Sequence, residues 1–478
     1  MVAVVVQVSV LAGLARLLLP KEFGVLAIVM TITTVGALLA DFGFANYIIH
    51  CKHLSRQLLR KIFAISIFGC VLLSIVAWVF AEDIARFCSA PAVTLAVRIS
   101  TVPVVLSGMT AIVSSLLQKN FCFIQISKSE IVATLLNGGM SIGLAISGFG
   151  FYSILGGQIL GGLVKLVLLY PEFLNRYRLL EDSCSKDADR AIVFTMYQFT
   201  DKLLSIVTSN GDKIIVGKML GPEALGVYTI AWQILSRPIS LINPIVNRVM
   251  LPVLCQNELG DRQLQSVYIK MLKMLAALLF PIYIFVAFSP HLVMRLFAGD
   301  NWAHGAPILT ILSARAMLQT LGNPIGTLIV AKGVPQLGLI LNCICVLIGT
   351  GALIIGCKIN IVSACFALLI VDFFGFCITE PIFRYKIAKM SIVNYAASMR
   401  FVVVGLLLSA SGSIVYNTWL VRIPNAFIQL AVGLIGSTFF VFLVVKFDTD
   451  VRLKYCELKM LLVYVWNNWL YNKFVSPK

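Results

Sequence analysis

Residues 59–80 of the chain read LRKIFAISIFGCVLLSIVAWVF, an apolar run whose only charges lie in its first turn. A run of about 20 apolar residues is long enough to cross a bilayer as a helix. Similar runs recur along the 478 residues, and they do not alternate apolar with polar positions as membrane β-strands do. The sequence therefore predicts an all-α polytopic membrane protein.

Composition agrees with a membrane location and argues against a nucleic-acid partner. Hydrophobic residues make up 59% of the chain and charged residues 12%, about half of the roughly 25% found in soluble domains. The net charge is +17, from 38 Lys and Arg against 21 Asp and Glu. These bases lie mainly in short segments between apolar runs, where they set orientation and contact anionic lipids. We therefore expect membrane lipids, and no nucleic acid, as partners.

The apolar runs give about fourteen transmembrane helices, with twelve as the lower limit because some runs suit interfacial helices. The first run is slightly short for a span, and we expect the chain to begin late within its first helix. The expected spans are 1–18, 22–50, 59–80, 93–117, 128–147, 151–172, 191–218, 223–254, 266–288, 304–331, 336–356, 361–383, 399–417 and 425–445.

An internal repeat predicts two pseudo-symmetric lobes around a central cavity. LLPKEFGV at 18–25 recurs as LGPEALGV at 220–227, and each copy turns one span into the next. Six spans separate the copies, so the halves run in the same direction, as in parallel transporter repeats. The predicted organisation is a six-helix lobe at 1–173, an inter-lobe loop at 174–190, a second six-helix lobe at 191–388, two additional helices at 389–446 and a basic tail at 447–478.

The distribution of basic residues predicts that both termini are cytoplasmic in a bacterial inner membrane. Lysine and arginine are enriched in cytoplasmic loops. Loops on one side hold Lys52, Arg60, Lys119, Arg176, Arg190, Lys332, Arg384 and Lys386, whereas the opposite loops hold little beyond Lys21, Arg86, Lys218, Arg295, Lys358 and Arg422.

The sequence predicts no metal site, no cofactor and no catalytic activity. The 12 cysteines lie mostly singly within apolar runs, and Cys343 and Cys345 point to different faces of one helix. The 4 histidines form no ligand spacing. A polysaccharide polymerase or a glycosyltransferase needs a sizeable loop with acidic or histidine residues, but the longest loop expected, at 173–190, is short. We therefore expect a protein that is not an enzyme.

Two predicted spans carry polar stripes. An ionised group in hydrocarbon costs about 2.5–3.5 kcal/mol on insertion scales, so those that persist usually face a cavity or a partner. Helical spacing puts Gln233, Arg237 and Arg248 on one face of span 223–254, and Arg315, Gln319 and Asn323 on one face of span 304–331. Arg237 and Arg315 lie mid-span, which favours a water-filled cavity. A cationic cavity suits an anionic substrate such as a lipid diphosphate.

Other charges lie within the predicted spans, and two readings remain for them. Arg16, Asp41, Asp201 and Asp372 are each expected in a different helix. They are either paired structural ions or groups that face the cavity, and the structural reading is favoured for Arg16 and Arg248 near the interfaces. A carboxylate in the cavity can also hold a coupling ion, which makes Asp41, Asp201 and Asp372 candidates for that role.

The sequence resembles the polysaccharide-transporter family, the Wzx-type flippases of O-antigen and exopolysaccharide. This family belongs to a superfamily with the multidrug extruders and the lipid II flippase, and the chain is nearest its colanic-acid and teichuronic-acid exporter branch. The segments that carry the resemblance are ARLLLPKEFGVLAIV (15–29), LLADFGFANYIIH (38–50), KSEIVATLLNGGMSIGLAISGFGFYSILGGQ (128–158), NGDKIIVGKMLGPEALGVYTIAWQILSRPI (210–239) and INPIVNRVMLPVL (242–254).

The resemblance implies alternating access and an undecaprenyl-diphosphate-linked oligosaccharide as substrate, for exopolysaccharide, lipopolysaccharide O-antigen or capsule. It also implies a polysaccharide polymerase or export complex as a partner. Related flippases use arginines on the first and eighth helices and an aspartate on the second, which match Arg16, Arg237 or Arg248, and Asp41. The alternative within the superfamily is a cation-coupled multidrug extruder, which the excess of arginine disfavours.

Overall fold

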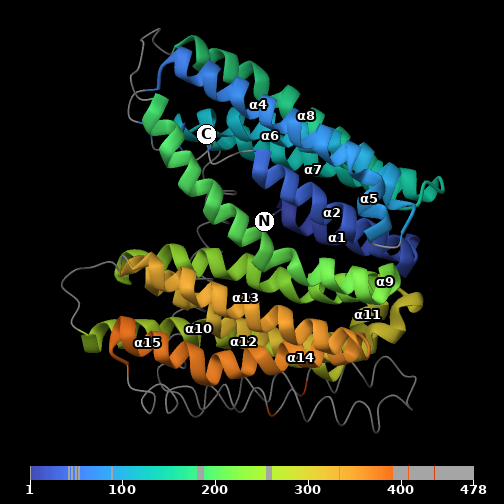
Figure 1. The fold of residues 1–478 in the computed structure, drawn as a ribbon, viewed down its shortest axis with the longest axis vertical. Coiled ribbons are helices and arrows are strands. Elements are labelled where there is room, and N and C mark those ends of the chain that lie inside the picture. The colour runs from blue at the N-terminus through green and yellow to red at the C-terminus, as the bar shows by residue number, and fades with distance from the viewer. Residues whose placement is uncertain are drawn as a thin grey trace, which may run out of the picture. The chain divides into compact units, whose positions relative to one another are not determined.

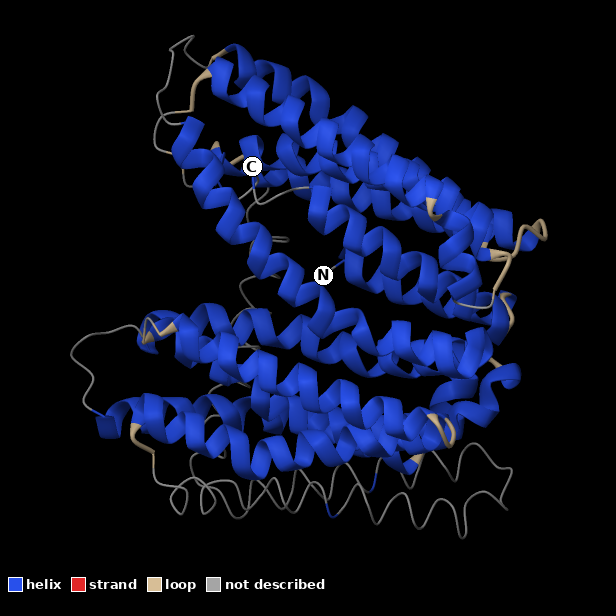
Figure 2. Ribbon diagram, in the orientation of Figure 1, coloured by secondary structure: helices blue, strands red, loops and turns tan. Residues whose placement is uncertain are grey.

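The computed structural model describes residues 2–40, 44, 47–48, 51, 54–87, 90–179, 188–254, 261–332 and 334–390, with 407 and 435 as single positions. Every regular element within these ranges is a helix, as Figure 2 shows. The first helices are α1 (Val2–Leu17), α2 (Pro20–Ala40), α4 (Arg56–Val79), α5 (Ala81–Phe87), α6 (Val93–Lys119), α7 (Phe123–Ile146) and α8 (Tyr152–Arg178) (Figure 1). The prediction of an all-α protein is confirmed for this part of the chain.

The second half continues the same pattern of long helices. Its elements are α9 (Ala188–Leu254), α10 (Asp261–Phe288), α11 (Pro290–Ala298), α12 (Ala306–Ala331), α13 (Pro335–Cys357), α14 (Ile361–Phe374) and α15 (Glu380–Ala388), with a 3-10 helix at Asp300–Gly305 and a π-helix at Gly375–Thr379.

The protein is a multi-pass membrane protein. Within the described ranges, 8 helical segments are long and apolar enough to cross a membrane. They are Arg56–Val79, Val93–Lys119, Phe123–Ile146, Tyr152–Arg178, Asn210–Asn243, Arg262–Phe288, Gln336–Cys357 and Ile361–Ile387. The expected helices at 399–417 and 425–445 lie outside the described residues apart from Leu407 and Ile435, so the total of fourteen stays a prediction.

Helix α9 is two helices joined at a bend. Gly221 has φ 83° and ψ 176°, a conformation outside the helical region that glycine adopts without steric cost. The sequence places the end of one span at 218 and the start of the next at 223, so the bend lies where the pattern of apolar runs breaks.

The two copies of the repeated motif touch each other. Helix α2 begins at Pro20, and Pro222 follows the bend in α9. A Cβ atom on Gly24 would overlap the carbonyl group of Pro222, and one on Gly226 would overlap the carbonyl oxygen of Pro20. The backbones therefore approach too closely for any side chain at either glycine. The repeat forms a reciprocal backbone crossing.

Short helices occupy equivalent places in the two halves, and neither is expected from the sequence. Helix α5 lies between α4 and α6, and α11 lies between α10 and α12. They have 7 and 9 residues, too few to appear as an apolar run of spanning length. Arg86 lies in the last turn of α5 and Arg295 in the last turn of α11, where a cation is favourable for the helix dipole. The repeated order agrees with a parallel repeat, and the lobe boundaries stay a prediction.

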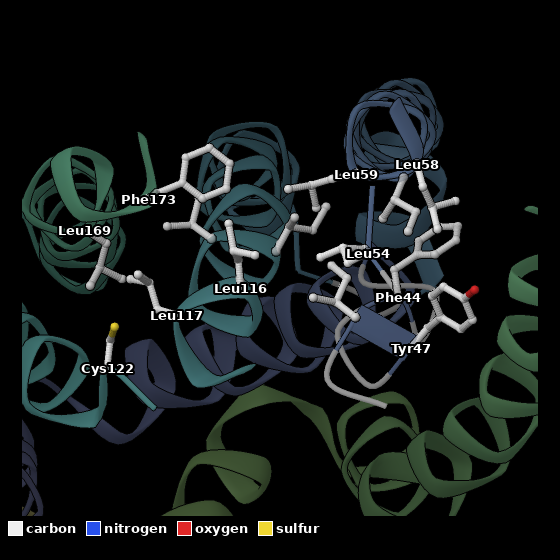
Figure 3. Packing of buried hydrophobic residues seen from close by; sticks show 14 residues of the cluster. Phe44, Tyr47, Leu54, Leu58, Leu59, Leu116, Leu117, Cys122, Leu169 and Phe173 are labelled. Carbon is white, nitrogen blue, oxygen red and sulfur yellow. The ribbon is translucent and has the colours of Figure 1, made fainter. Parts of the chain in front are cut away.

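The chain forms two compact units. The first comprises residues 1–230 with Arg295–His304 and Leu353–Ile361, and the second comprises 231–294, 305–352 and 362–478. In the first unit, a core of buried side chains fills the space between α4, α6 and α8 (Figure 3). Lipid tails are as apolar as these side chains, so burial from water does not drive the contacts between helices within the membrane. Van der Waals packing stabilises them instead. Core residues include Phe44, Tyr47, Leu54, Leu58, Leu59, Leu116, Leu117, Leu169 and Phe173.

Candidate functional site

The predicted polar stripe on α12 meets an acidic residue from another helix. Arg315 Nε donates to Asp372 Oδ2 at 2.9 Å, and Gln319 Nε2 donates to the same oxygen at 3.0 Å. Arg315 and Gln319 lie one turn apart on α12, whereas Asp372 lies near the end of α14. The structure therefore joins residues that the sequence assigns to separate roles, substrate binding for Arg315 and ion coupling for Asp372.

An aromatic ring completes this group. The guanidinium carbon of Arg315 lies 5.2 Å from the ring centroid of Trp232 in α9. An arginine over an indole face gains about 0.5–2 kcal/mol, more when it is shielded from solvent. Here Arg315, Gln319, Asp372 and Trp232 are called the Arg315 cluster. Sequence reasoning missed Trp232, although it directly precedes Gln233 of the predicted stripe.

The Arg315 cluster is mostly, but not completely, buried. The side chain of Arg315 is 11% exposed and that of Asp372 is 23% exposed. An unpaired ion in such a place is costly, and a partner offsets much of that cost. Part of the Asp372 side chain lies at the surface of the bundle, so the helices do not enclose the pair completely. The Arg315 cluster therefore brings a cation, its counter-ion and an aromatic ring together within the second unit.

The remaining predicted residues of the two stripes are placed differently. Gln233 and Arg237 lie one turn apart on α9 and are both half-buried. Asn323 is exposed on α12. Near Arg237, the Tyr283 hydroxyl of α10 donates to the backbone oxygen of Leu235 at 3.3 Å, which fixes this part of α9. The role of all three polar residues in a cavity stays a prediction.

Arg16 packs against the short helix α11. Its Nη2 donates to the backbone oxygen of Leu296 at 2.5 Å, in the last turn of α11. Next to it, Trp302 Nε1 donates to the backbone oxygen of Ala15 at 2.8 Å, and the indole meets the ring of Phe23 edge-on at 5.5 Å. These contacts agree with the structural reading left open for Arg16. Its substrate-binding role stays a prediction.

Three predicted site residues cannot be placed. Asp41 lies outside the described residues, and so do the side chains of Asp201 and Arg248. Asp212, a further charge of the α9 segment, is described. It accepts hydrogen bonds from the Tyr228 hydroxyl at 2.6 Å and from the backbone nitrogen of Lys213 at 2.8 Å. These bonds indicate a structural role for Asp212.

The prediction that Arg384 belongs to a basic loop is wrong. After the π-helix the chain continues as α15, and Arg384 is 1% exposed within it. Its guanidinium pairs with Glu380, donates to the Tyr268 hydroxyl at 3.1 Å and donates to the backbone oxygen of Leu321 at 3.2 Å. The i, i+4 spacing of Glu380 and Arg384 is the sequence signal that indicates this pair.

Family and sequence relatives agree on one kind of protein. The model of the family described as polysaccharide biosynthesis protein matches residues 13–307. The chain is 30% identical to the teichuronic acid biosynthesis protein TuaB of Bacillus subtilis, over 63% of this chain and 62% of that protein. It is 25% identical to the lipopolysaccharide biosynthesis protein WzxC of Escherichia coli, over 68% and 66%. These matches span a little under two thirds of each relative's length.

Solved structures share the fold. The lipid II flippase MurJ in an inward closed conformation matches with a TM-score of 0.68 at 13% identity, over 93% of this chain and 97% of that one. An inward-facing multidrug resistance MATE transporter of the MOP superfamily matches with a TM-score of 0.51 at 14% identity, over 86% and 95%. Because the family model covers more than half of its length, the chain belongs to the polysaccharide biosynthesis protein family, the polysaccharide transporters that its sequence resembles.

Proposed function

We propose that the protein is a flippase that carries undecaprenyl-diphosphate-linked oligosaccharides across the bacterial inner membrane by alternating access. The translocated oligosaccharides would supply the synthesis of exopolysaccharide, O-antigen or capsule, and a polymerase or export complex would act on them next. Two relatives are named for the biosynthesis of teichuronic acid and lipopolysaccharide, and a third, ExoT of Rhizobium meliloti, is named a succinoglycan biosynthesis transport protein. Family membership and a fold shared with a flippase support the proposal.

The observation that carries this proposal is the Arg315–Asp372 pair. A guanidinium holds carboxylates and phosphates through the same planar fork of donors. Asp372 therefore accepts from the Arg315 guanidinium as a diphosphate oxygen would. When no substrate is present, this pairing lowers the free-energy cost of keeping the cation in the bundle. A diphosphate that reaches the pair takes the place of Asp372. When the diphosphate leaves, Asp372 binds Arg315 again.

The other predicted residues extend this site. Gln233, Arg237 and Asn323 would line the cavity with Arg315 and Gln319, and Arg16 and Arg248 would contribute further positive charge. Asp41 and Asp201 remain candidates for coupling to an ion, together with Asp372. Trp232 joins the list because its ring faces the Arg315 guanidinium.

The test compares Arg315→Ala with Asp372→Asn and with the reversed pair Arg315→Asp/Asp372→Arg. The readouts are polymer export in a flippase-null strain and the amount of protein in the membrane. We expect Arg315→Ala to abolish export, since the diphosphate loses its cation. We expect Asp372→Asn to lower the protein level, because Arg315 loses its counter-ion, and to reduce export by more than the protein level falls, because the competing charge that helps release the substrate is gone. The reversed pair should restore the protein level without restoring export.

A matched control is Arg98→Ala. Arg98 is 33% exposed, lies over the ring of Trp78 and pairs at 3.0 Å with Glu82, which is 58% exposed, so it is a paired arginine that belongs to no part of the proposed site. Export by this variant should stay normal. If the reversed Arg315–Asp372 pair exports as well as the wild type, or if all losses follow the protein level, the pair is structural and the proposed site is wrong.

A further inference from the structure

Basic side chains gather where the first turns of α4 meet the last turn of α8. Arg56 and Arg60 both lie over the ring of Tyr177, with guanidinium carbons 5.7 and 5.9 Å from its centroid. Arg60 Nε donates to the Tyr177 hydroxyl at 2.5 Å, and Arg56 Nη2 donates to the backbone oxygen of Arg178 at 3.0 Å. The α4–α8 basic cluster is defined as Arg56, Arg60, Lys61, Arg176 and Arg178.

The charges of this cluster are concentrated rather than dispersed. Two guanidinium groups share one aromatic ring, so like charges are held close together. Helix α4 has no acidic residue in its first turn, where the partial positive charge of a helix end disfavours cations. Arg176 pairs with Glu172 at 3.2 Å, which neutralises one of the five basic side chains. A bound anion would offset part of the repulsion between the two guanidinium groups that share the ring of Tyr177.

Aromatic stacking holds the arginines in position. The ring of Tyr177 stacks on Phe173 with centroids 6.0 Å apart, and Phe173 stacks on Phe63 of α4 at 6.4 Å. Phe173 is buried in the core shown in Figure 3. The ring that carries both guanidinium groups is therefore anchored to the core of the first unit. Such anchoring reduces the side-chain entropy that the arginines lose when an anion binds.

The cluster lies at one end of α4 and α8, next to the exposed apolar residues of the same two helices. Lys61 is exposed and shares its helical face with Phe68 and Ile75, which are 70% and 55% exposed. Arg178 is exposed too, eleven residues after Val167, which is 67% exposed and lies on the same face of α8. Exposed apolar faces of membrane-spanning helices contact acyl chains. Basic groups thus lie at headgroup level over surfaces suited to those chains.

We infer that the α4–α8 basic cluster binds the phosphate of an anionic phospholipid from the surrounding bilayer. Arginine and lysine donate charge-assisted hydrogen bonds to the phosphate oxygens, and the acyl chains lie along Phe68, Ile75 and Val167. A polyprenyl diphosphate offers related chemistry. The bilayer phospholipid is favoured because Lys61 and Arg178 are exposed at the ends of the same helix faces that carry the exposed apolar residues, where the surrounding lipid can reach them.

The experiment measures lipid bound to the full-length protein by native mass spectrometry. Purified protein receives phosphatidylglycerol, phosphatidylcholine or undecaprenyl diphosphate in separate samples. The wild type should retain phosphatidylglycerol over phosphatidylcholine. The variant Arg60→Gln/Lys61→Gln should lose phosphatidylglycerol occupancy by about fivefold or more, since each basic residue near the membrane surface adds roughly that factor. Tyr177→Leu, which keeps every charge, should lose less.

A matched control is Lys128→Gln/Arg262→Gln, which removes the same charge from two exposed residues at the starts of α7 and α10. It should retain phosphatidylglycerol as the wild type does. Equal losses in both double variants would mean that only net charge matters, and the site would not exist. Selective loss of undecaprenyl diphosphate with unchanged phosphatidylglycerol would assign the cluster to a substrate and overturn the inference. Because lipid retention is measured without transport, this outcome is independent of the proposed function.

Discussion

Arg315 and Arg384 are both ionised side chains of the second unit, and the structure holds them in different ways. Arg384 is 1% exposed, and its acid, Glu380, lies one turn away on the same helix. Further bonds to Tyr268 and Leu321 join it to α10 and α12. Arg315 has its acid on another helix, and that acid is partly exposed. Arg384 is therefore suited to a structural role, and Arg315 to an exchange of partners.

Arg237 permits a test at this scale. It is half-buried on α9, one turn from Gln233. We predict that Arg237→Ala abolishes polymer export in a flippase-null strain, because a fixed cation offsets part of the cost of bringing a diphosphate into the membrane. Arg237→Lys should keep part of the export, since lysine keeps the charge but loses the bidentate fork. Normal export by the alanine variant would contradict the prediction, and loss only in proportion to membrane protein level would indicate a structural ion.

The helices show which features a single sequence can predict. Apolar runs of spanning length locate the long helices, because each such run must satisfy its own backbone hydrogen bonds in lipid. Helices α5 and α11 escape this pattern because they are shorter than a span. The apolar pattern does not predict the π-helix at Gly375–Thr379 either. The wider π-turn changes the helix face on which the following side chains, Glu380 and Arg384, lie.

Contacts between helices are harder to predict than the helices themselves. Arg315 and Asp372 are 57 residues apart on different helices. The periodicity of one helix shows which side chains share a face, but it does not show which helix that face meets. The stripe of Arg315, Gln319 and Asn323 is thus predicted, whereas the partner Asp372 and the ring of Trp232 require the structure. Of the stripe, Asn323 is exposed and only the first two residues contact Asp372.

The crossing of the two repeat motifs gives a prediction at the element scale. Gly24→Ala or Gly226→Ala places a Cβ atom against the backbone of the opposite motif, which must shift. We expect each variant to lose about 1–3 kcal/mol of stability, the usual cost of overpacking, and to show a lower Tm in detergent. Gly139→Ala on α7 is the matched control, because its Cβ would meet no atom within 4 Å. An alanine there should leave Tm unchanged or raise it. An unchanged Tm for both Gly24→Ala and Gly226→Ala would refute the close crossing.

At the scale of the whole molecule, the order of elements repeats. The sequence α4, α5, α6 recurs as α10, α11, α12, and α2 and the second half of α9 begin at matching motifs. A parallel repeat requires an even number of spans before the second copy begins. Among the described residues, α1, α2, α4, α6, α7 and α8 coincide with the six spans expected before α9. The same parity determines on which side of the membrane each loop lies.

The topology that follows is testable with reporter fusions. Arg56 and Arg60 begin α4, and Arg176 and Arg178 end α8, so these bases lie at one end of their helices. Since basic loops stay in the cytoplasm, we predict that fusions after residues 183 and 478 are active only with a cytoplasmic reporter. A fusion after Gly148, in the turn between α7 and α8, should be active only with a periplasmic reporter, because one span separates it from α8's basic end. A periplasmically active fusion at 183 or 478 would overturn this topology, and such a result at 183 would also place the α4–α8 basic cluster in the outer leaflet.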